Sequence, residues 1–336
     1  MTASTPSSPA IPRNNLGKTG PAVSRLALGC MGMSGMYGAS DEREGIATIQ
    51  AALERGVNLL DTGDFYGMGH NELLIGKALA GRRQDAVLSV KFGALRAPGG
   101  GWLGVDTRPA AVSTFLAYSL TRLGTDYIDI YRPARLDPNV PIEETIGALA
   151  DLVKAGHIRA IGLSEVGADT IRRAHAVHPI TDLQIEYSLI SRGPEQKIFP
   201  MLQQLGMGVT AYGVLSRGLL SGSKPTGSSD FRQYLPRFAG AAGEHNRQLV
   251  EALGAVAQGQ GLTTSQLAIA WVLAKRGGIV PVLGARTRQQ LDESLGALKV
   301  ELSPEIVAKV DSLVETSGVQ GDRYQTAQMQ HLDSER

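Results

Sequence analysis

The chain has 336 residues, of which 43% are apolar and 19% are charged, a balance typical of a globular protein with a large core. Its formal net charge is +1 and it has no run of Lys or Arg, which argues against a nucleic-acid-binding surface. Cys30 is the only cysteine, which excludes an internal disulfide and fits a reducing cytoplasm.

The opening residues, MTASTPSSPAIPRNN, lack the basic start and the apolar stretch of a secretory signal. No segment reaches the roughly 20 uninterrupted apolar residues that a membrane span needs. We therefore expect a cytoplasmic protein that binds neither nucleic acid nor a membrane.

Short apolar runs alternate with longer amphipathic runs along most of the chain. We expect strands at residues 25–30, 57–61, 86–91, 127–131, 158–164, 182–187, 208–212 and 278–283. The helical patterns between the first of these strands cover residues 41–56, 71–81, 108–124, 142–156 and 167–177. Several helices end in glycine, as in TRLGT and QQLGM, the residue expected at a helix carboxyl end.

About eight strand–helix units of roughly 35 residues fit the chain, which predicts an α/β fold, the eight-stranded parallel β/α (TIM) barrel. A doubly wound open sheet shows the same alternation. However, no GxGxxG follows the first strand and no P-loop pattern is present, which favours the barrel.

Two stretches interrupt this alternation of strands and helices. Residues 215–243, after the seventh strand, are rich in Gly, Ser and Pro and longer than a simple connection, which indicates a functional loop. Residues 317–336 follow the last amphipathic helix and are expected to form a mobile tail or flap. We expect a disordered tail at 1–13, the barrel at 14–316 and this carboxyl-terminal tail at 317–336.

The stretch LLDTGDFYG, residues 59–67, places two carboxylates and a phenol where the second strand leaves the core. Asp and Gly are ordinary turn residues, so a simple turn is one explanation. A catalytic cluster is the other, because active sites of such barrels lie at the carboxyl ends of the strands. The third strand ends at Lys91, whose burial demands a carboxylate partner that Asp61 can supply. Lys91 near Tyr66 would lower the pKa of that phenol and make it a general acid, whereas Asp64 is expected to be a turn residue.

Here the sequence resembles the aldo-keto reductases. The motifs that carry the likeness are LLDTGDFYG, NELLIGKAL, LSVKFG, YIDIYRPARLDP, IGLSE, QIEYSLISR, TAYGVLSRGLLSG and GARTRQQLDESLGAL, in family order over about residues 14–315. The opening NNLGKTGPAVSRLALGCMGMS is similar to the amino-terminal hairpin and first strand of the bacterial ketone-reducing branch. The resemblance implies a barrel that binds NADPH and passes hydride to a carbonyl carbon, with Asp61, Tyr66 and Lys91 in three of four catalytic places.

The fourth catalytic place departs from the family pattern. Members usually carry a histidine after strand four, and Ala134 stands there in YRPARLDP. Loss of one oxyanion donor can cost roughly 100- to 1000-fold in rate. Arg132, Arg135, a water or His70 could compensate.

The resemblance also implies a set of cofactor contacts. Ser164 and Gln184 match the pair that holds the nicotinamide carboxamide, and Tyr212 matches the ring that stacks on it. Two arginines near a phosphate monoester favour NADPH over NADH. The remaining matches are Glu165, in place of a more frequent asparagine, Leu215 and Arg217 on the pyrophosphate side, and Gly284, Arg286, Arg288, Gln290 and Glu293 around the adenine and 2′-phosphate.

Three functions remain open from the sequence. The first is an NADPH-dependent carbonyl reductase acting on a small molecule, with a bulky ring ketone such as a 3-keto trichothecene as a suggestion. The second is an NADPH-binding sensor or accessory protein with weak turnover, since Ala134 replaces histidine. The third is an unrelated barrel isomerase or lyase. His175 and His178 lack a third ligand, so no metal is expected. Trp102 is either a substrate wall or a loop anchor.

Overall fold

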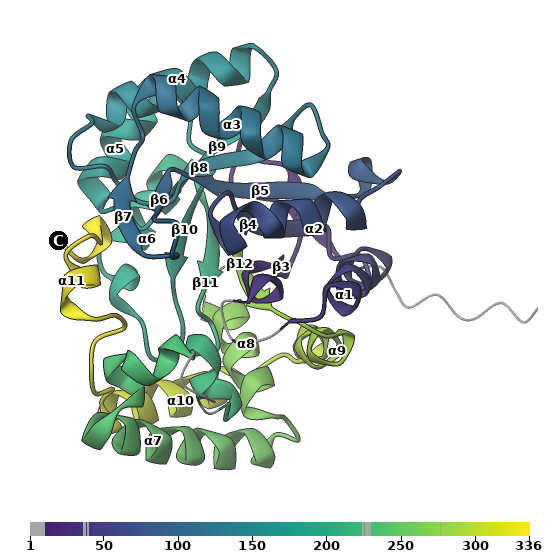
Figure 1. Ribbon diagram of the computed structural model, residues 1–336. Helices are drawn as coiled ribbons and strands as arrows, with labels where there is room; N and C mark the ends of the chain where they lie inside the picture. The colour runs from purple at the N-terminus through teal and green to yellow at the C-terminus, as the bar shows by residue number, and fades with distance from the viewer. Residues whose placement is uncertain (1–10, 36–37, 39, 224, 226–229, 276) are drawn as a thin grey trace, which may run out of the picture.

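The computed structural model describes residues 11–35, 38, 40–223, 225, 230–275 and 277–336. Its centre is a closed barrel of eight parallel strands, visible as the central arrows of Figure 1, which confirms the predicted TIM barrel. Around the barrel the strands follow chain order: β3 (Ala27–Gly29), β4 (Leu59–Gly63), β5 (Val87–Phe92), β8 (Ile128–Pro133), β9 (Ile158–Ser164), β10 (Asp182–Glu186), β11 (Gly208–Tyr212) and β12 (Ile279–Gly284).

Helices surround the barrel and cover its outer face (Figure 1). The α-helices of the described chain are α1 (Glu42–Glu54), α2 (His70–Ala78), α3 (Pro109–Leu123), α4 (Ile142–Lys154), α5 (Ala168–Val177), α6 (Ile198–Leu205), α7 (Gly240–Gly259), α8 (Thr264–Lys275), α9 (Arg288–Gly296), α10 (Pro304–Ser317) and α11 (Thr326–Met329). The predicted glycine stops are found at Gly124 and Gly206, where φ values of 64° and 70° end α3 and α6 in the left-handed region.

The barrel interior is layered, because alternate residues of each strand point inward. The layer at the amino-terminal ends is apolar and includes Ala27, Leu59, Val87, Ile130 and Val282. Two residues further along β4, β5 and β8 the inward positions become polar, with Asp61, Ser89 and Arg132.

Two antiparallel hairpins flank the barrel. The amino-terminal hairpin, β1 (Arg13–Asn15) with β2 (Ala22–Ser24), was predicted and is present. Its Leu16 and Val23 pack on the apolar interior layer and so close that end of the barrel. The second hairpin, β6 (Ala94–Arg96) with β7 (Trp102–Val105), lies beyond β5 and was not predicted.

The described part of the long connection after β11 contains three short 3-10 turns. These are η5 (Ser216–Ser221), η6 (Phe231–Tyr234) and η7 (Pro236–Phe238), and α7 then begins at Gly240. Further 3-10 turns are η1 (Met31–Ser34), η2 (Tyr66–Gly69), η3 (Arg83–Asp85), η4 (Gly193–Glu195), η8 (Ala297–Lys299) and η9 (Asp333–Glu335). The predicted tail at residues 1–13 falls largely on residues outside the described chain, although Arg13 begins β1.

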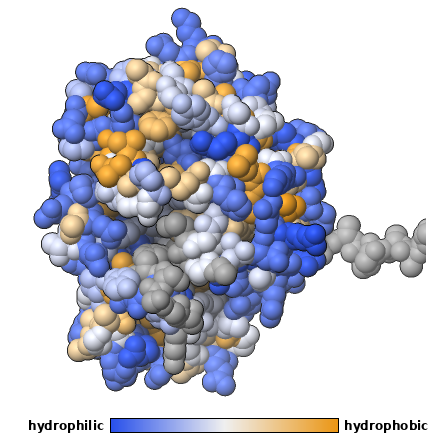
Figure 2. Space-filling model, viewed as in Figure 1, coloured by the Kyte–Doolittle hydropathy of each residue, from blue (hydrophilic) through white to orange (hydrophobic). Residues whose placement is uncertain are grey.

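The face shown in Figure 2 is mostly hydrophilic, with hydrophobic residues in small separate groups. The large exposed apolar side chains are likewise scattered, for example Met68, Tyr118 and Tyr234. In the part of the chain that is described, no helix has the length and apolar character required to cross a bilayer.

Candidate active site

The predicted catalytic residues meet at the carboxyl ends of neighbouring strands. Gly63 at the end of β4 pairs in register with Lys91 near the end of β5, and Asp61 pairs with Ser89. Tyr66 follows β4 directly, at the first position of η2. Strand pairing therefore brings Asp61 and Lys91 together, and the short turn after β4 adds Tyr66.

Asp61 and Lys91 form a buried ion pair beneath Tyr66. The Lys91 Nζ donates to Asp61 Oδ1 at 2.5 Å and to Gln184 Oε1 at 2.9 Å. Gln184 Nε2 in turn donates to Asp61 Oδ2 at 2.7 Å. The lysine, the aspartate and the glutamine are 4%, 5% and 2% exposed, so water does not screen this contact.

Tyr66 lies over the ammonium group. Lys91 Nζ is 5.3 Å from the centroid of the Tyr66 ring, and the Phe65 ring meets the Tyr66 ring edge-on at 4.7 Å. Burial lowers the pKa of Lys91, an effect that Asp61 opposes. The arrangement holds a buried cation next to the Tyr66 ring, and a nearby cation favours the ionised form of a phenol that donates its proton.

Asp64 is more than a turn residue. It is 8% exposed, and its Oδ2 accepts a hydrogen bond from Gly93 N at 3.2 Å. Burial raises its pKa to about 7, and the neighbouring Glu72 carboxylate contributes to the increase. Glu72 is itself buried and receives a hydrogen bond from Arg122 Nε at 2.5 Å. Sequence reasoning missed this buried acidic pair beside Tyr66.

Ala134 stands at the place of the family's histidine. Ala134 is 2% exposed, and its backbone N donates to Phe92 O at 2.8 Å, which fixes it just beyond β8. His70 lies elsewhere, because its Nδ1 contacts Ser34 Oγ at 2.9 Å and its Nε2 is 3.6 Å from Glu42. His70 is thus engaged by η1 and α1, and its compensation for Ala134 stays a prediction.

The two candidate arginines near Ala134 have different surroundings. Arg132 is completely buried inside the barrel and donates from Nη1 to Asp182 Oδ2 at 3.0 Å. Arg135 is only partly buried, and within the described chain its side chain donates one hydrogen bond, to Ala134 O at 2.6 Å. The pKa of Arg135 is raised, because Tyr212, Tyr324 and Glu165 outweigh the effect of burial, and its charge also acts on Lys91. Arg135 thus lies at the mouth of the barrel and Arg132 does not.

The residues matched to the nicotinamide lie at the ends of β9, β10 and β11. Ser164 is 1% exposed, and its Oγ has no hydrogen-bond partner among the described residues. A buried hydroxyl without a partner is costly, so this atom fits a ligand group such as a carboxamide. Gln184 is engaged by Lys91 and Asp61 and would have to share its amide with a ligand.

Glu165 is occupied by another part of the chain. Its Oε2 accepts from Arg323 Nη2 at 2.6 Å and from Ser334 Oγ at 2.6 Å, and its Oε1 accepts from Arg323 Nη1 at 3.0 Å. Although Glu165 is buried, the charge of Arg323 lowers its pKa to about 2. Glu165 therefore anchors the carboxyl-terminal segment in this structure.

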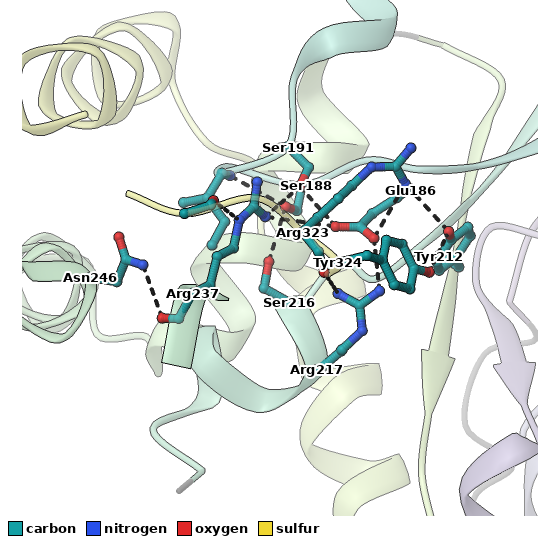
Figure 3. Close-up of polar contacts among 12 residues, drawn as sticks. Glu186, Ser188, Ser191, Tyr212, Ser216, Arg217, Arg237, Asn246, Arg323 and Tyr324 are labelled. Atoms are coloured by element: carbon teal, nitrogen blue, oxygen red, sulfur yellow. Dashed lines mark hydrogen bonds and ion pairs between the residues drawn. The ribbon is translucent and has the colours of Figure 1, made fainter. Parts of the chain in front are cut away.

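The carboxyl-terminal segment, residues 319–336, crosses the barrel mouth on the β9–β11 side (Figures 1 and 3). Tyr324 OH lies 3.0 Å from Tyr212 OH, and the Arg217 guanidinium lies 4.3 Å from the Tyr324 ring centroid. Arg217 also donates to Glu186 Oε2 at 3.1 Å and to Arg323 O at 3.3 Å. The predicted tail is therefore docked against the hydroxyl group of Tyr212, the residue matched to the nicotinamide.

The connection after β11 has an unusual backbone. Ser216 and Arg217, which follow Leu215, have φ values of 46° and 55°, a left-handed conformation that is unfavourable for residues with a side chain. Strained backbone of this kind is concentrated at functional sites. The strained backbone supports the prediction that the connection after β11 is a functional loop.

The residues matched to the adenine and 2′-phosphate lie together after β12. Gly284 ends β12, Thr287 caps α9 by accepting from Gln290 N, and Gln290 Oε1 accepts from Arg286 N at 2.8 Å. The exposed Arg288 pairs with Glu44 through Nη2 at 2.9 Å. Glu293 Oε1 accepts from Thr263 Oγ1 at 3.2 Å.

Comparison with known proteins agrees with this arrangement. The model of the aldo/keto reductase family matches residues 25–315. The glycerol dehydrogenase AKR11B4 from Gluconobacter oxydans is 28% identical with a TM-score of 0.83, and the match covers 92% of this chain and 97% of that one. The holo form of aldo-keto reductase AKR11C1 from Bacillus halodurans is 30% identical with a TM-score of 0.75, covering 94% and 99%.

A third similar structure is the thermostable aldo-keto reductase Tm1743 in complex with the inhibitor epalrestat. It is 29% identical with a TM-score of 0.71, covering 90% of this chain and 99% of that one. A family match over most of the chain, together with these neighbours, makes the protein an oxidoreductase that uses a nicotinamide cofactor, NAD(P)H, and reduces carbonyl groups. The chain belongs to the aldo-keto reductase family.

Proposed function

We propose that this protein is an NADPH-dependent reductase of ketones or aldehydes in which Tyr66 gives the proton to the carbonyl oxygen. The observation that carries the proposal is the buried Asp61–Lys91 pair, with the ammonium group 5.3 Å from the Tyr66 ring centroid. When bound, the nicotinamide supplies the hydride.

Each residue has a separate part in the reaction. Tyr66 gives up its hydroxyl proton as negative charge develops on the substrate oxygen. Lys91 stabilises the phenolate that remains, because an opposite charge nearby favours the ionised form. Asp61 holds Lys91 in place and prevents it from being an unpaired buried cation.

We further propose that the cofactor is NADPH rather than NADH. Arg286 and Arg288 stand at the start of α9, and a guanidinium fork is well suited to a phosphate monoester. Arg288 would exchange its exposed contact with Glu44 for the 2′-phosphate, at little cost because exposed ion pairs contribute only about 0–1 kcal/mol. Ser164, Gln184, Tyr212, Leu215 and Arg217 would hold the rest of the cofactor.

The missing histidine is replaced, in this proposal, by Arg135. A carbonyl oxygen at the barrel mouth needs a donor besides Tyr66, and the Arg135 guanidinium has N–H groups beyond the one bonded to Ala134 O. Its charge acts on both Lys91 and Tyr212, as expected for a group between them. Arg132 is held inside the barrel by Asp182 and Ser89 and cannot serve in this way.

For the substrate we propose bulky ring ketones, such as 3-keto trichothecenes, as the class to assay first. Two further aromatic side chains, Phe65 and Trp102, lie on the same side of the site as Tyr66. The Arg96 guanidinium lies 5.6 Å from the ring centroid of each. Trp102 is 40% exposed and offers a flat apolar surface to a ring. The panel should also include glyceraldehyde and dihydroxyacetone, the carbonyl forms of glycerol, because one structural neighbour is named a glycerol dehydrogenase.

Steady-state oxidation of NADPH with a panel of ketones and aldehydes tests the reductase. Tyr66→Phe keeps the ring and removes the proton donor, so turnover should be lost while NADPH still quenches protein fluorescence on binding. Unchanged turnover in Tyr66→Phe would refute the assignment. Arg135→Met should lower kcat about 100-fold, the scale of one lost oxyanion donor, whereas Arg135→Lys should keep part of the rate.

A second function is favoured by Ala134: a protein that binds NADPH tightly as a sensor and turns over slowly. Stopped-flow observation of one hydride transfer in the preformed complex separates the two. Slow hydride transfer in the preformed complex supports the sensor, and rapid transfer with repeated turnover supports the reductase.

A further inference from the structure

Beneath the catalytic pair lies a polar layer that an ordinary hydrophobic barrel core does not need. Arg132 is fully buried on β8, and its partner Asp182 is fully buried on β10. Taking two charges out of water is costly, and a buried ion pair is often no more stabilising than an apolar pair of similar size. Its presence in the interior therefore calls for a reason other than stability.

The barrel makes room for this ion pair. A Cβ atom at Gly162, the inward position of β9 between the two strands, would come within 2.8 Å of Asp182 Oδ1 and 2.9 Å of Arg132 Cζ. Thr210 on β11 adds a hydrogen bond from its Oγ1 to Asp182 Oδ2 at 2.6 Å. Four neighbouring strands thus contribute to holding the guanidinium in one orientation.

The guanidinium connects directly to the catalytic carboxylate. Arg132 Nη2 donates to Ser89 Oγ at 3.1 Å, and Ser89 Oγ donates to Asp61 Oδ2 at 2.9 Å. Because the arginine can only donate, the single hydroxyl hydrogen of Ser89 is left for Asp61. A hydrogen-bonded relay therefore runs from Asp182 through Arg132 and Ser89 to Asp61, whose other oxygen receives Lys91.

The charge of Arg132 is also felt at the site. It contributes to the lowered pKa of Lys91, after the larger effects of burial and Asp61. Among the described residues, other ionisable groups near the Lys91–Tyr66 region include Asp61 from β4, Cys30 beside β3, Asp64 before η2, Arg96 from β6 and Arg135 after β8. Arg132 reaches the catalytic pair from inside the barrel, through Ser89.

Building on the proposed function, we infer that Arg132 is a positioning residue for catalysis: through Ser89 it fixes the Asp61 carboxylate, and its charge favours ionisation of Tyr66 through the Lys91 pair. Asp182 and Thr210 hold Arg132 for this purpose. The residue touches neither substrate nor cofactor.

Three variants separate the charge of Arg132 from its hydrogen bond. Arg132→Met with Asp182→Leu removes both charges and leaves no unpaired ion. It should lower kcat about tenfold and move the alkaline limb of the kcat profile upward by roughly one pH unit, because loss of a nearby cation disfavours the phenolate. Ser89→Ala keeps the charge of Arg132 and breaks the relay, so it should lower kcat and leave the alkaline limb of the kcat profile at its wild-type pH. Arg132→Lys should likewise leave the limb in place.

Thr145→Val is the matched control, since it removes a buried hydroxyl that contacts Thr107 on the outside of the barrel and leaves the contacts of Arg132, Asp182 and Ser89 intact. The inference is overturned if the folded double variant, verified by circular dichroism, has the wild-type pH profile. Should that variant fail to fold, wild-type kcat in Ser89→Ala overturns it equally. Turnover of Tyr66→Phe must be measured in parallel. If that variant keeps its turnover, the proposed function is refuted rather than the relay.

Discussion

Asp64 gives the sharpest test of the electrostatics beside Tyr66. Burial raises its pKa from 3.8 to about 7 in the folded chain. Below pH 4 the carboxyl is protonated in both folded and unfolded chains. Between about pH 4 and 7 the unfolded chain releases the proton and the folded chain retains it, so stability falls as the pH rises, and above pH 7 the loss is constant.

The size of this loss of stability follows from the difference between the folded and unfolded pKa values of Asp64. A difference of about three pKa units corresponds to roughly 4 kcal/mol of unfolding free energy at pH 8, and about 2 kcal/mol of it is already lost at pH 5. Asp64→Asn has the shape of the neutral acid and can still accept from Gly93 N. We therefore expect the variant to be more stable than the natural chain, with a gain that increases by about 2–3 kcal/mol from pH 5 to pH 8.

Urea denaturation at pH 5, 6, 7 and 8, followed by fluorescence and circular dichroism, measures the gain. Asp169→Asn, at an exposed aspartate of α5, controls for the loss of one negative charge. A gain that is equal at pH 5 and pH 8, or a loss that grows with pH, would show that the Asp64 carboxyl is not kept protonated by burial.

Three further outcomes are expected. Lys91→Met leaves Asp61 as a buried carboxylate without a cation, so denaturation at pH 8 should show a loss of about 3–5 kcal/mol of unfolding free energy. The double variant Asp61→Asn with Lys91→Met should recover most of that stability but show no NADPH oxidation. Arg323→Met removes the contacts with Glu165, so limited proteolysis should cut within residues 319–336 faster than in Arg336→Met, and equal rates would contradict the anchor. Arg288→Ala should raise the KM for NADPH about tenfold and leave the KM for NADH unchanged, since one charge-assisted phosphate contact contributes about 1.5 kcal/mol or more.

Most of the fold follows from local pattern. The eight strands lie where fully apolar runs predicted them, and α3 and α6 stop at glycines that can adopt positive φ. The β6–β7 hairpin was missed because APGGGWLGV contains too few apolar alternations to distinguish a hairpin from a loop. Asp61 and Lys91 could be placed together because they lie toward the carboxyl ends of two neighbouring parallel strands.

The rest of the site depends on contacts between residues that lie far apart in the sequence. Strand alternation from Ile130 gives a signal that Arg132 points into the barrel, but its partner Asp182 is 50 residues away. Glu165 and Arg323 are separated by 158 residues, and neither lies in a pattern that predicts a pairing. The docked carboxyl-terminal segment therefore could not be read from composition, which indicated only a polar stretch.

The anchor at Glu165 has a practical consequence for handling the protein. Ser334 and Arg323 share the Glu165 carboxylate, Asp333 accepts from Gly167 N at 2.8 Å, and Arg336 follows within a few residues. An affinity tag appended after Arg336 would begin beside the barrel mouth and could compete with ligands there. Purification handles belong at the opposite terminus, and kinetic comparisons between differently tagged preparations should be made only after the tag has been cleaved.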